Sequence, residues 1–347
     1  MDIEVLRVIW LVLIGILWTG YLVLEGFDFG VGMLLPILGR TDTDRRLMIN
    51  TIGPLWDGNE VWVLTAGGAT FAAFPLWYST LFSAFYLPLL LILVGLILRG
   101  VAFEYRGKIA DTQWAAGWDW AIIIGSYLPS LLWGVAFGNL VHGATLEDYK
   151  AGPFAILLHA LNAYSLVAGI TVVLLFMLHG SLFLSLKTSG DMRQRAMKMA
   201  ATLSIPTTIV AAVWAIWTQW VYSDKLWTWA IVAVAAIALI GTILATRQHR
   251  EGLGFTLTSL VSAGAVLMIF ATNFPKVLPL TANNQDISLT ITNASSTALT
   301  LTTMTWVAVI FVPIVLAYQA WSIWIFRRRL STTNIPLPAG LTSLKAF

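Results

Sequence analysis

The chain has 347 residues, of which 58% are hydrophobic and 11% are charged, with a formal net charge of +3. A soluble globular protein carries about 25% charged residues, because its surface must be solvated. This composition excludes the soluble globular, disordered and collagen-like classes and indicates a multi-pass membrane protein. The chain has no cysteine, which excludes disulfides, thiolate metal sites and a cysteine nucleophile. We expect no nucleic-acid partner, because the few positive charges of such a protein set its orientation in the membrane.

Uncharged stretches predict the helices that cross the bilayer, because each crossing needs about 20 apolar residues. The N-terminal stretch lacks the basic start and cleavage site of a signal peptide, so we expect it to be the first span. The uncharged run 61–98 is too long for one span, and Phe74-Pro75 is its natural break. The predicted spans cover about residues 6–37, 51–74, 77–100, 119–141, 153–186, 199–222, 226–246, 254–275 and 302–326. We therefore predict one all-α membrane domain with about nine transmembrane helices.

Basic residues predict the orientation of these spans, because cytoplasmic loops are enriched in Lys and Arg. Sixteen of the 20 Lys and Arg residues fall on one side of the predicted spans. The other side holds Arg7, Lys150, Lys225 and Lys276. This asymmetry predicts an N-terminus outside, a C-terminus in the cytoplasm, and an extracytoplasmic loop over 276–301. Alternating apolar residues over 287–291 could form a short strand in that loop.

Carboxylates inside predicted spans are the strongest functional signal, because an unpaired charge in lipid costs several kcal/mol. Glu25 and Asp28 are three residues apart in the first span, and Asp57 and Glu60 are three apart in the second. Each pair therefore shares a helix face. With Glu104 after the third span, these acids converge on the cytoplasmic half under the predicted topology.

Two functions fit this cluster, a proton-uptake relay and a cation site. Trp56, Asn59 and Trp62 surround the second acid pair and could supply hydrogen bonds to a proton path. A purely structural alternative is that the acids, including Asp119 at the start of the fourth span, pair with basic neighbours. Those neighbours are Arg99, Arg106 and Lys108.

The histidines make a weak case for metal or haem binding. His142 and His249 lie in predicted loops. His159 and His179 are 20 residues apart, about 30 Å on a straight helix, so they cannot bind one metal together. Either could ligate a haem, although a lone buried histidine is more often simply hydrogen-bonded. We predict no metal site, and no nucleotide-binding motif is present.

Several motifs resemble subunit II of the cytochrome bd quinol oxidases. They are 25–34 (EGFDFGVGML), 45–50 (RRLMIN), 54–62 (PLWDGNEVW), 99–108 (RGVAFEYRGK), 134–140 (GVAFGNL) and 304–313 (MTWVAVIFVP). The resemblance spans nearly the whole chain and is most specific in the first 140 residues. It implies nine helices arranged as two four-helix bundles and one peripheral helix.

The resemblance also implies a function in the bacterial cell membrane. The family forms a terminal oxidase that oxidises quinol and reduces oxygen to water, and a partner, subunit I, ligates haems b558, b595 and d. Subunit II supports assembly, contributes to proton uptake from the cytoplasm and can bind a structural quinone; small accessory single-span subunits can join the complex. Glu25, Asp28, Asp57 and Glu104 match the family's acidic proton-path positions, and we expect no catalysis by this chain alone.

A secondary transporter coupled to protons or cations is the alternative, because such proteins also bury acids within membrane helices. Transporters often place matching interrupted helices in their two halves. Here the acids crowd the first four predicted spans, which favours the oxidase subunit.

Overall fold

The computed structural model describes residues 2–145, 152–283 and 285–335. Eight helices of this part of the chain are long and apolar enough to cross a membrane, and the predicted all-α polytopic class is confirmed. They are α1 (Ile3–Leu38), α5 (Tyr86–Tyr105), α6 (Thr112–His142), α9 (Ala163–Lys187), α10 with its π-helical end (Gly190–Tyr222), α11 with the preceding 3₁₀ turn (Leu226–Arg247), α12 (Glu251–Asn273) and α13 (Ala298–Ile325).

The predicted span 51–74 has a different form in the structure. Its beginning belongs to a separate helix, α2 (Asp42–Ile52), which starts with a capping box between Thr41 and Asp44. The helix α3 (Trp56–Ala73) follows after a turn that contains Pro54. With 18 residues and a polar first turn, α3 is shorter than the eight helices above and is not among those apolar enough to cross a membrane.

Two other predicted spans are interrupted. The span 77–100 divides into α4 (Pro75–Ala84) and α5, while α3 ends at Ala73, next to the Phe74-Pro75 step. The long predicted helix 153–186 is not continuous: α8 (Pro153–Ala160) and α9 are separate helices. Asn162 causes the restart, because its side chain accepts the backbone N–H of Ser165 at 2.9 Å and caps α9.

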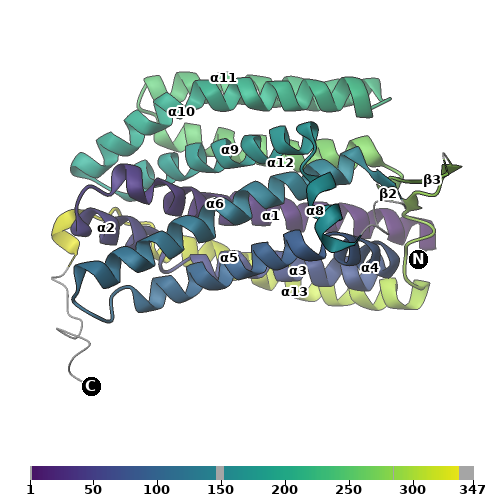
Figure 1. Cartoon of the computed structure of the whole chain (residues 1–347), viewed down its shortest axis with the longest axis horizontal. Coiled ribbons are helices and arrows are strands. Elements are labelled where there is room, and N and C mark those ends of the chain that lie inside the picture. The colour runs from purple at the N-terminus through teal and green to yellow at the C-terminus, as the bar shows by residue number, and fades with distance from the viewer. Residues whose placement is uncertain (1, 146–151, 284, 336–347) are drawn as a thin grey trace.

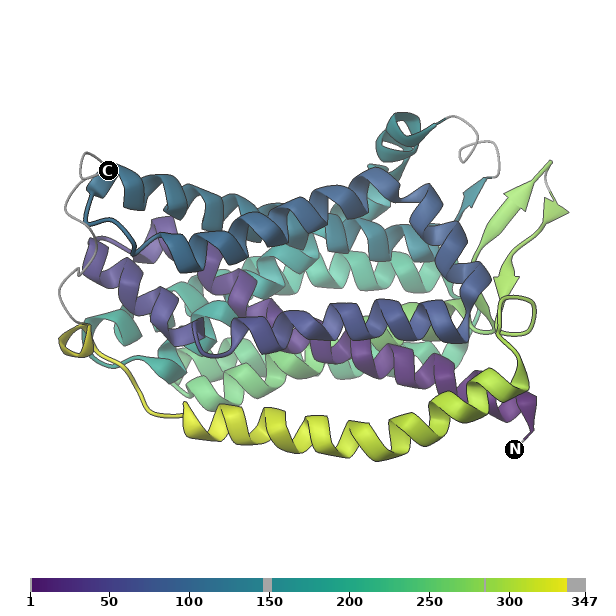
Figure 2. The same ribbon diagram turned by 90° about the horizontal axis from the view of Figure 1, so that it is seen from below.

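The long helices run side by side along the longest axis of the molecule (Figure 1). The helices α9, α10, α11 and α12 pack on one another, and α1 and α6 pack on α9. The helices α3 and α5 complete the other side, against α1 and α6 respectively. The helix α13 lies at the edge of the bundle beside α1 and α3, as Figure 2 shows in yellow-green.

Glycines allow α1 and α9 to approach at the centre of the bundle. A Cβ atom on Gly30 would lie 2.0 Å from the carbonyl oxygen of Phe176, and one on Gly180 would lie 2.5 Å from the carbonyl carbon of Gly30. No side chain fits in these gaps, so the two backbones touch directly. This crossing places the middle of α1, which carries Glu25 and Asp28, in the core.

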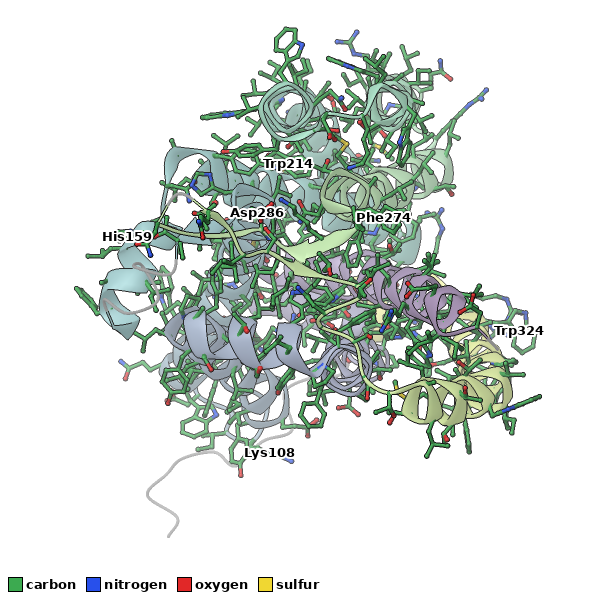
Figure 3. All side chains as sticks on the ribbon, turned by 90° about the vertical axis from the view of Figure 1, so that its right-hand side faces the viewer. Lys108, His159, Trp214, Phe274, Asp286 and Trp324 are labelled. Atoms are coloured by element: carbon green, nitrogen blue, oxygen red, sulfur yellow. The ribbon has the colours of Figure 1, made fainter. Side chains whose placement is uncertain are left out.

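Short strands form the end of the molecule that the topology assigns to the outside. Strand β1 (Ala144–Thr145) pairs with β3 (Leu280–Ala282), which pairs with β4 (Gln285–Asp286). Strand β2 (Lys276–Leu278) pairs antiparallel with β5 (Leu289–Thr290). Strand β5 lies within 287–291, the segment in which the sequence predicts a short strand. Figure 3 looks onto this end, with Phe274 and Asp286 labelled. Lys150 and Lys345, which the sequence predicts to lie outside and in the cytoplasm respectively, fall outside the described residues.

Candidate functional site

Arg99 occupies the centre of the candidate site. It lies on α5, six residues before the helix ends, and its side chain has no exposed surface. The guanidinium donates to Glu25 Oε1 on α1 through Nη2, and the same nitrogen lies 3.5 Å from Glu60 Oε2 on α3. Its Cζ also lies 4.2 Å from the centroid of the Phe29 ring, a cation–π contact. One cation therefore joins acids from two other helices.

Asp28 lies one turn further along α1 and has a separate neutral partner. Its side chain is fully buried, and Oδ2 accepts a hydrogen bond from Nδ2 of Asn59 at 2.7 Å. Asn59 is also fully buried, and its Oδ1 accepts from Nε2 of Gln319 on α13 at 2.8 Å. Three helices thus meet at this amide.

The cluster leaves several polar atoms without partners among the described residues. Glu25 Oε2, Asp28 Oδ1, and Nε and Nη1 of Arg99 are buried and make no hydrogen bond to that part of the chain. Buried polar atoms are nearly always satisfied by protein or ordered water. The arrangement therefore has the hydrogen-bonding capacity to hold water or an exchangeable proton between carboxylates.

The other predicted acids lie outside this buried centre. Glu60 is intermediate, with 19% of its side chain exposed, and it connects Arg99 to the flank of α3. Asp57 and Glu104 are both exposed on the flank of α3 and α5. The structure therefore brings Glu25, Asp28 and Glu60 together around Arg99, and leaves Asp57 and Glu104 at the surface of this chain.

Of the three predicted supporting residues, Asn59 alone donates a side-chain hydrogen bond within the described chain. Trp56 packs on Phe103, with ring centroids 5.2 Å apart. Trp62 packs on Gly20, where a Cβ atom would lie 2.3 Å from the indole ring. These two tryptophans fill space between helices.

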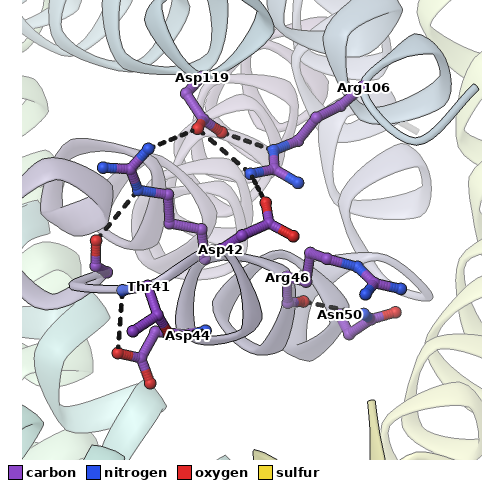
Figure 4. Close-up of polar contacts among 9 residues, drawn as sticks. Thr41, Asp42, Asp44, Arg46, Asn50, Arg106 and Asp119 are labelled. Atoms are coloured by element: carbon purple, nitrogen blue, oxygen red, sulfur yellow. Dashed lines mark hydrogen bonds and ion pairs between the residues drawn. The ribbon is translucent and has the colours of Figure 1, made fainter. Parts of the chain in front are cut away.

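Asp119 belongs to a second ionic cluster near α2 (Figure 4). Its carboxylate accepts from Arg106 Nε at 2.6 Å and from Arg45 Nη1 at 3.0 Å. Arg106 also donates to Asp42 at 2.8 Å. Each carboxylate in this group contacts an arginine. Asp119 therefore fits the alternative raised from the sequence, in which an acid pairs with basic neighbours and has a structural role. The pairing of Glu25 with Arg99 shows that a cationic partner also exists inside the acid cluster.

His179 is the one fully buried histidine among the described residues, and both its ring nitrogens are occupied. Nε2 lies 3.1 Å from the Val23 carbonyl oxygen, and Nδ1 lies 2.7 Å from the Thr258 hydroxyl. Because a carbonyl oxygen only accepts, Nε2 carries the proton. Neither nitrogen of His179 is available to a haem iron in this arrangement. Within the described ranges, no group of three His, Asp or Glu side chains could hold a metal ion.

Gln319 is the site residue that sequence reasoning missed. The last predicted span contains no charged residue, so no carboxylate drew attention to it. The available signal was an amide within an apolar helix, which needs a hydrogen-bond partner.

Comparisons with known proteins agree on one family. The family model for cytochrome bd terminal oxidase subunit II matches residues 6–326. The cytochrome bd-I ubiquinol oxidase subunit 2 of Escherichia coli K12 is 39% identical, over 96% of this chain and 97% of that protein. The cytochrome bd ubiquinol oxidase subunit 2 of Bacillus subtilis is 40% identical, over 93% and 96%.

The fold also has a solved counterpart. The structure of the bd oxidase from Geobacillus thermodenitrificans contains a chain that superposes with a TM-score of 0.73, over 92% of this chain and 97% of that one. The sequences are 15% identical, so this likeness concerns the fold. The match of the family model and of the relatives confirms the resemblance seen in the sequence motifs. The chain belongs to the family of cytochrome bd terminal oxidase subunit II.

Proposed function

We propose that this chain is subunit II of a membrane oxidase that oxidises quinol and reduces oxygen to water, and that it conducts protons toward a haem-bearing partner. The names of the relatives, which are ubiquinol oxidase subunits, support the overall reaction. Haems b558, b595 and d belong in this proposal to subunit I. The occupied ring nitrogens of His179 are consistent with that assignment.

The proposed surface for subunit I is the flank formed by α3, α5 and α13. Exposed carboxylates are unfavourable against lipid, and this flank carries Asp57 and Glu104. The helix α13 is apolar and exposed along most of its length, with Trp306 and Trp324 66% and 58% exposed. Burial of such a surface by a partner would support assembly of the complex.

The observation that carries the proton role is the enclosed group of Glu25, Asp28 and Arg99, next to the half-buried Glu60. Protons would enter at the cytoplasmic end of the contact with subunit I, at the carboxylates of Asp57 and Glu104, pass to Glu60 and reach Glu25. Arg99 compensates the negative charge of Glu25 and Glu60, so a proton can move without leaving an isolated charge in the membrane. Asp28, which is also fully buried and lies one turn nearer the cytoplasmic end of α1, would exchange protons with the same group.

The proposed entry side is the cytoplasm. The basic residues near α2 and at the start of α10, including Arg45 and Arg193, lie at the end of the bundle opposite the strands. Cytoplasmic ends carry such residues. Proton uptake from this side, during oxygen reduction at the partner, would generate a membrane potential.

The test uses the intact complex with Asp28→Asn and Asp57→Asn, which keep side-chain size and remove the exchangeable acid proton. Turnover and charge translocation should fall by at least about tenfold in Asp28→Asn. The haem absorption spectrum and the yield of complex should be unchanged. Asp224→Asn, which alters an exposed carboxylate at the opposite end, is the matched control. Full activity and normal proton uptake in both Asp28→Asn and Asp57→Asn would refute the proton role.

A further inference from the structure

Gln319 stands out on α13 by its environment. Between Val309 and Trp321, every side chain other than Gln319 is exposed in this chain. Gln319 is half-buried, and its Nε2 points at Oδ1 of Asn59, 2.8 Å away. This hydrogen bond joins the peripheral helix to the buried acids.

The amide of Asn59 is constrained on both sides: its Nδ2 faces Asp28 Oδ2 at 2.7 Å and the Leu24 carbonyl oxygen at 3.4 Å, and its Oδ1 faces Gln319. When Asp28 is ionised its carboxylate can only accept, and Nδ2 of Asn59 is then the donor in the 2.7 Å contact. The amide oxygen of Asn59 then points away from α1 and needs a donor. Gln319 supplies that donor, and the chain Gln319–Asn59–Asp28 runs in one direction from α13 to α1.

We propose that Gln319 is a positioning residue for the proton path: it holds the Asn59 amide in the orientation that presents an N–H donor to Asp28. The inference rests on the proposed proton role of Asp28. Without Gln319, the Asn59 oxygen loses its donor on α13, and the amide, then held only by Asp28 and the 3.4 Å contact with the Leu24 carbonyl, can turn its oxygen toward Asp28. Hydrogen bonding to the ionised carboxylate would then be lost, and the balance between the two forms of Asp28 would change.

The position of Gln319 also explains why its effect should be indirect. The charged groups that face Asp28 are Glu25 on the same helix, Glu60 on α3 and Arg99 on α5. Gln319 contributes no charge, and it reaches Asp28 through Asn59. Its removal should therefore change the pH dependence of turnover while leaving the ion pairs of Arg99 in place.

The experiment compares Gln319→Met, Asp28→Asn and Gln248→Met in the intact two-subunit complex. Methionine keeps the length of glutamine and removes the donor. Gln248 is the matched control, because it is exposed after the end of α11, away from the proposed surface for subunit I, and its side chain makes no hydrogen bond within the described chain. We expect Gln319→Met to slow turnover about fivefold and to shift its pH profile, with an unchanged haem spectrum. Gln248→Met should match the unaltered complex in rate and pH profile.

A double-mutant cycle with Asn59→Leu tests whether Gln319 acts through Asn59. Once the amide is gone, Gln319→Met should cause no further loss. An equal loss in both backgrounds would overturn the inference, as would a normal rate and pH profile in Gln319→Met while Asp28→Asn is slow. If Asp28→Asn is itself fully active, the proposed proton role of Asp28 is wrong, and the positioning role of Gln319, which depends on it, is wrong as well.

A second variant, Gln319→Glu, covers the case in which Gln319→Met does not fold or assemble. If Gln319→Met does not assemble, Gln319→Glu keeps the length and can donate only when protonated, so turnover should decline as the pH rises. A flat pH profile in Gln319→Glu, or failure of both variants to assemble, would overturn the positioning role and assign Gln319 to packing.

Discussion

Arg99 donates to Glu25 across the contact between α5 and α1, and thereby joins residues 74 positions apart whose side chains have no exposed surface. The pair matters for both stability and function. In the membrane core a single buried charge is costly, whereas a paired charge is tolerated. The same guanidinium lies near Glu60. Two carboxylates and one guanidinium carry a net negative charge, which a bound proton would neutralise.

Replacement of Arg99 should destabilise the complex strongly. Arg99→Met leaves Glu25 without its cation, and loss of one partner of a buried pair typically costs about 3–5 kcal/mol. The thermal midpoint of the detergent-solubilised complex should fall well below that of Arg328→Met, which alters an exposed arginine. The double variant Arg99→Met, Glu25→Met should recover part of the loss. Equal midpoints for the two arginine variants would contradict the central role of this pair.

Asp119 should contribute more to stability than Asp42, although both accept from Arg106. Asp119 has 5% of its side chain exposed and binds two arginines, whereas Asp42 has 47% exposed and binds one. Asp119→Asn should cost about 1.5–3 kcal/mol, the range for hydrogen bonds to charged groups. Asp42→Asn should cost less, because exposed ion pairs are weak.

Denaturant unfolding of the complex, with hydrogen exchange in α2 as a local probe, measures this difference. Faster exchange in α2 is expected for Asp119→Asn, since Arg45 on α2 loses its partner. Proton uptake should remain normal in both variants. The interpretation would be wrong if Asp42→Asn were the more damaging change.

The crossing of α1 and α9 should not tolerate a side chain at Gly30. A Cβ atom there would lie 2.0 Å from the Phe176 carbonyl oxygen, so the helices must separate. Gly30→Ala should cost at least about 1–3 kcal/mol, the usual range for an overpacked core. Gly264→Ala on α12 is the matched control, because the nearest atom would be 3.8 Å away. That change should be neutral or stabilising by up to about 1 kcal/mol. Thermal unfolding of the two variants checks the contrast.

The strands at the outer end should lose stability in acid. Hydrogen bonds from Lys276, at 2.5 Å, and from Ser288 hold the pKa of Asp286 well below its usual value. A carboxyl group with a lowered pKa stabilises the folded form above its unfolded pKa, about 3.9 for aspartate, and this contribution is lost as the pH falls below that value.

Hydrogen exchange over 276–290 should therefore accelerate below about pH 4. Asp286→Asn should abolish this pH-dependent acceleration. Both side chains are partly exposed, 40% for Lys276 and 58% for Asp286, so raised salt should weaken the effect. Exchange that is independent of pH in the unaltered protein would show that the pair does not hold the strands together. The membrane helices serve as the internal reference.

The sequence motifs predicted the family, and the apolar runs predicted the class of fold. Both follow from local properties: a run of about 20 apolar residues must be helical in lipid, because its backbone groups have no other partners. The acids at Glu25 and Asp28 were recognisable for the same reason, since a carboxylate within such a run is costly. The boundaries were harder, and Asn162 shows why. A single cap residue divided the predicted helix 153–186 in two.

The tertiary structure alone decided which of these groups meet. Asp57 and Glu25 looked equivalent in sequence, but α3 turns Asp57 to the surface and Asn59 and Glu60 inward. The partner of Asn59 is Gln319, 260 positions away, and no local pattern connects the two. The sequence by itself determined that Glu25 and Asp28 lie within an apolar helix long enough to cross a membrane, because that depends only on the residues of the run itself. Helix packing determined that Glu25 pairs with Arg99 and Asp28 with Asn59, because side-chain contacts depend on how each helix is rotated against its neighbours.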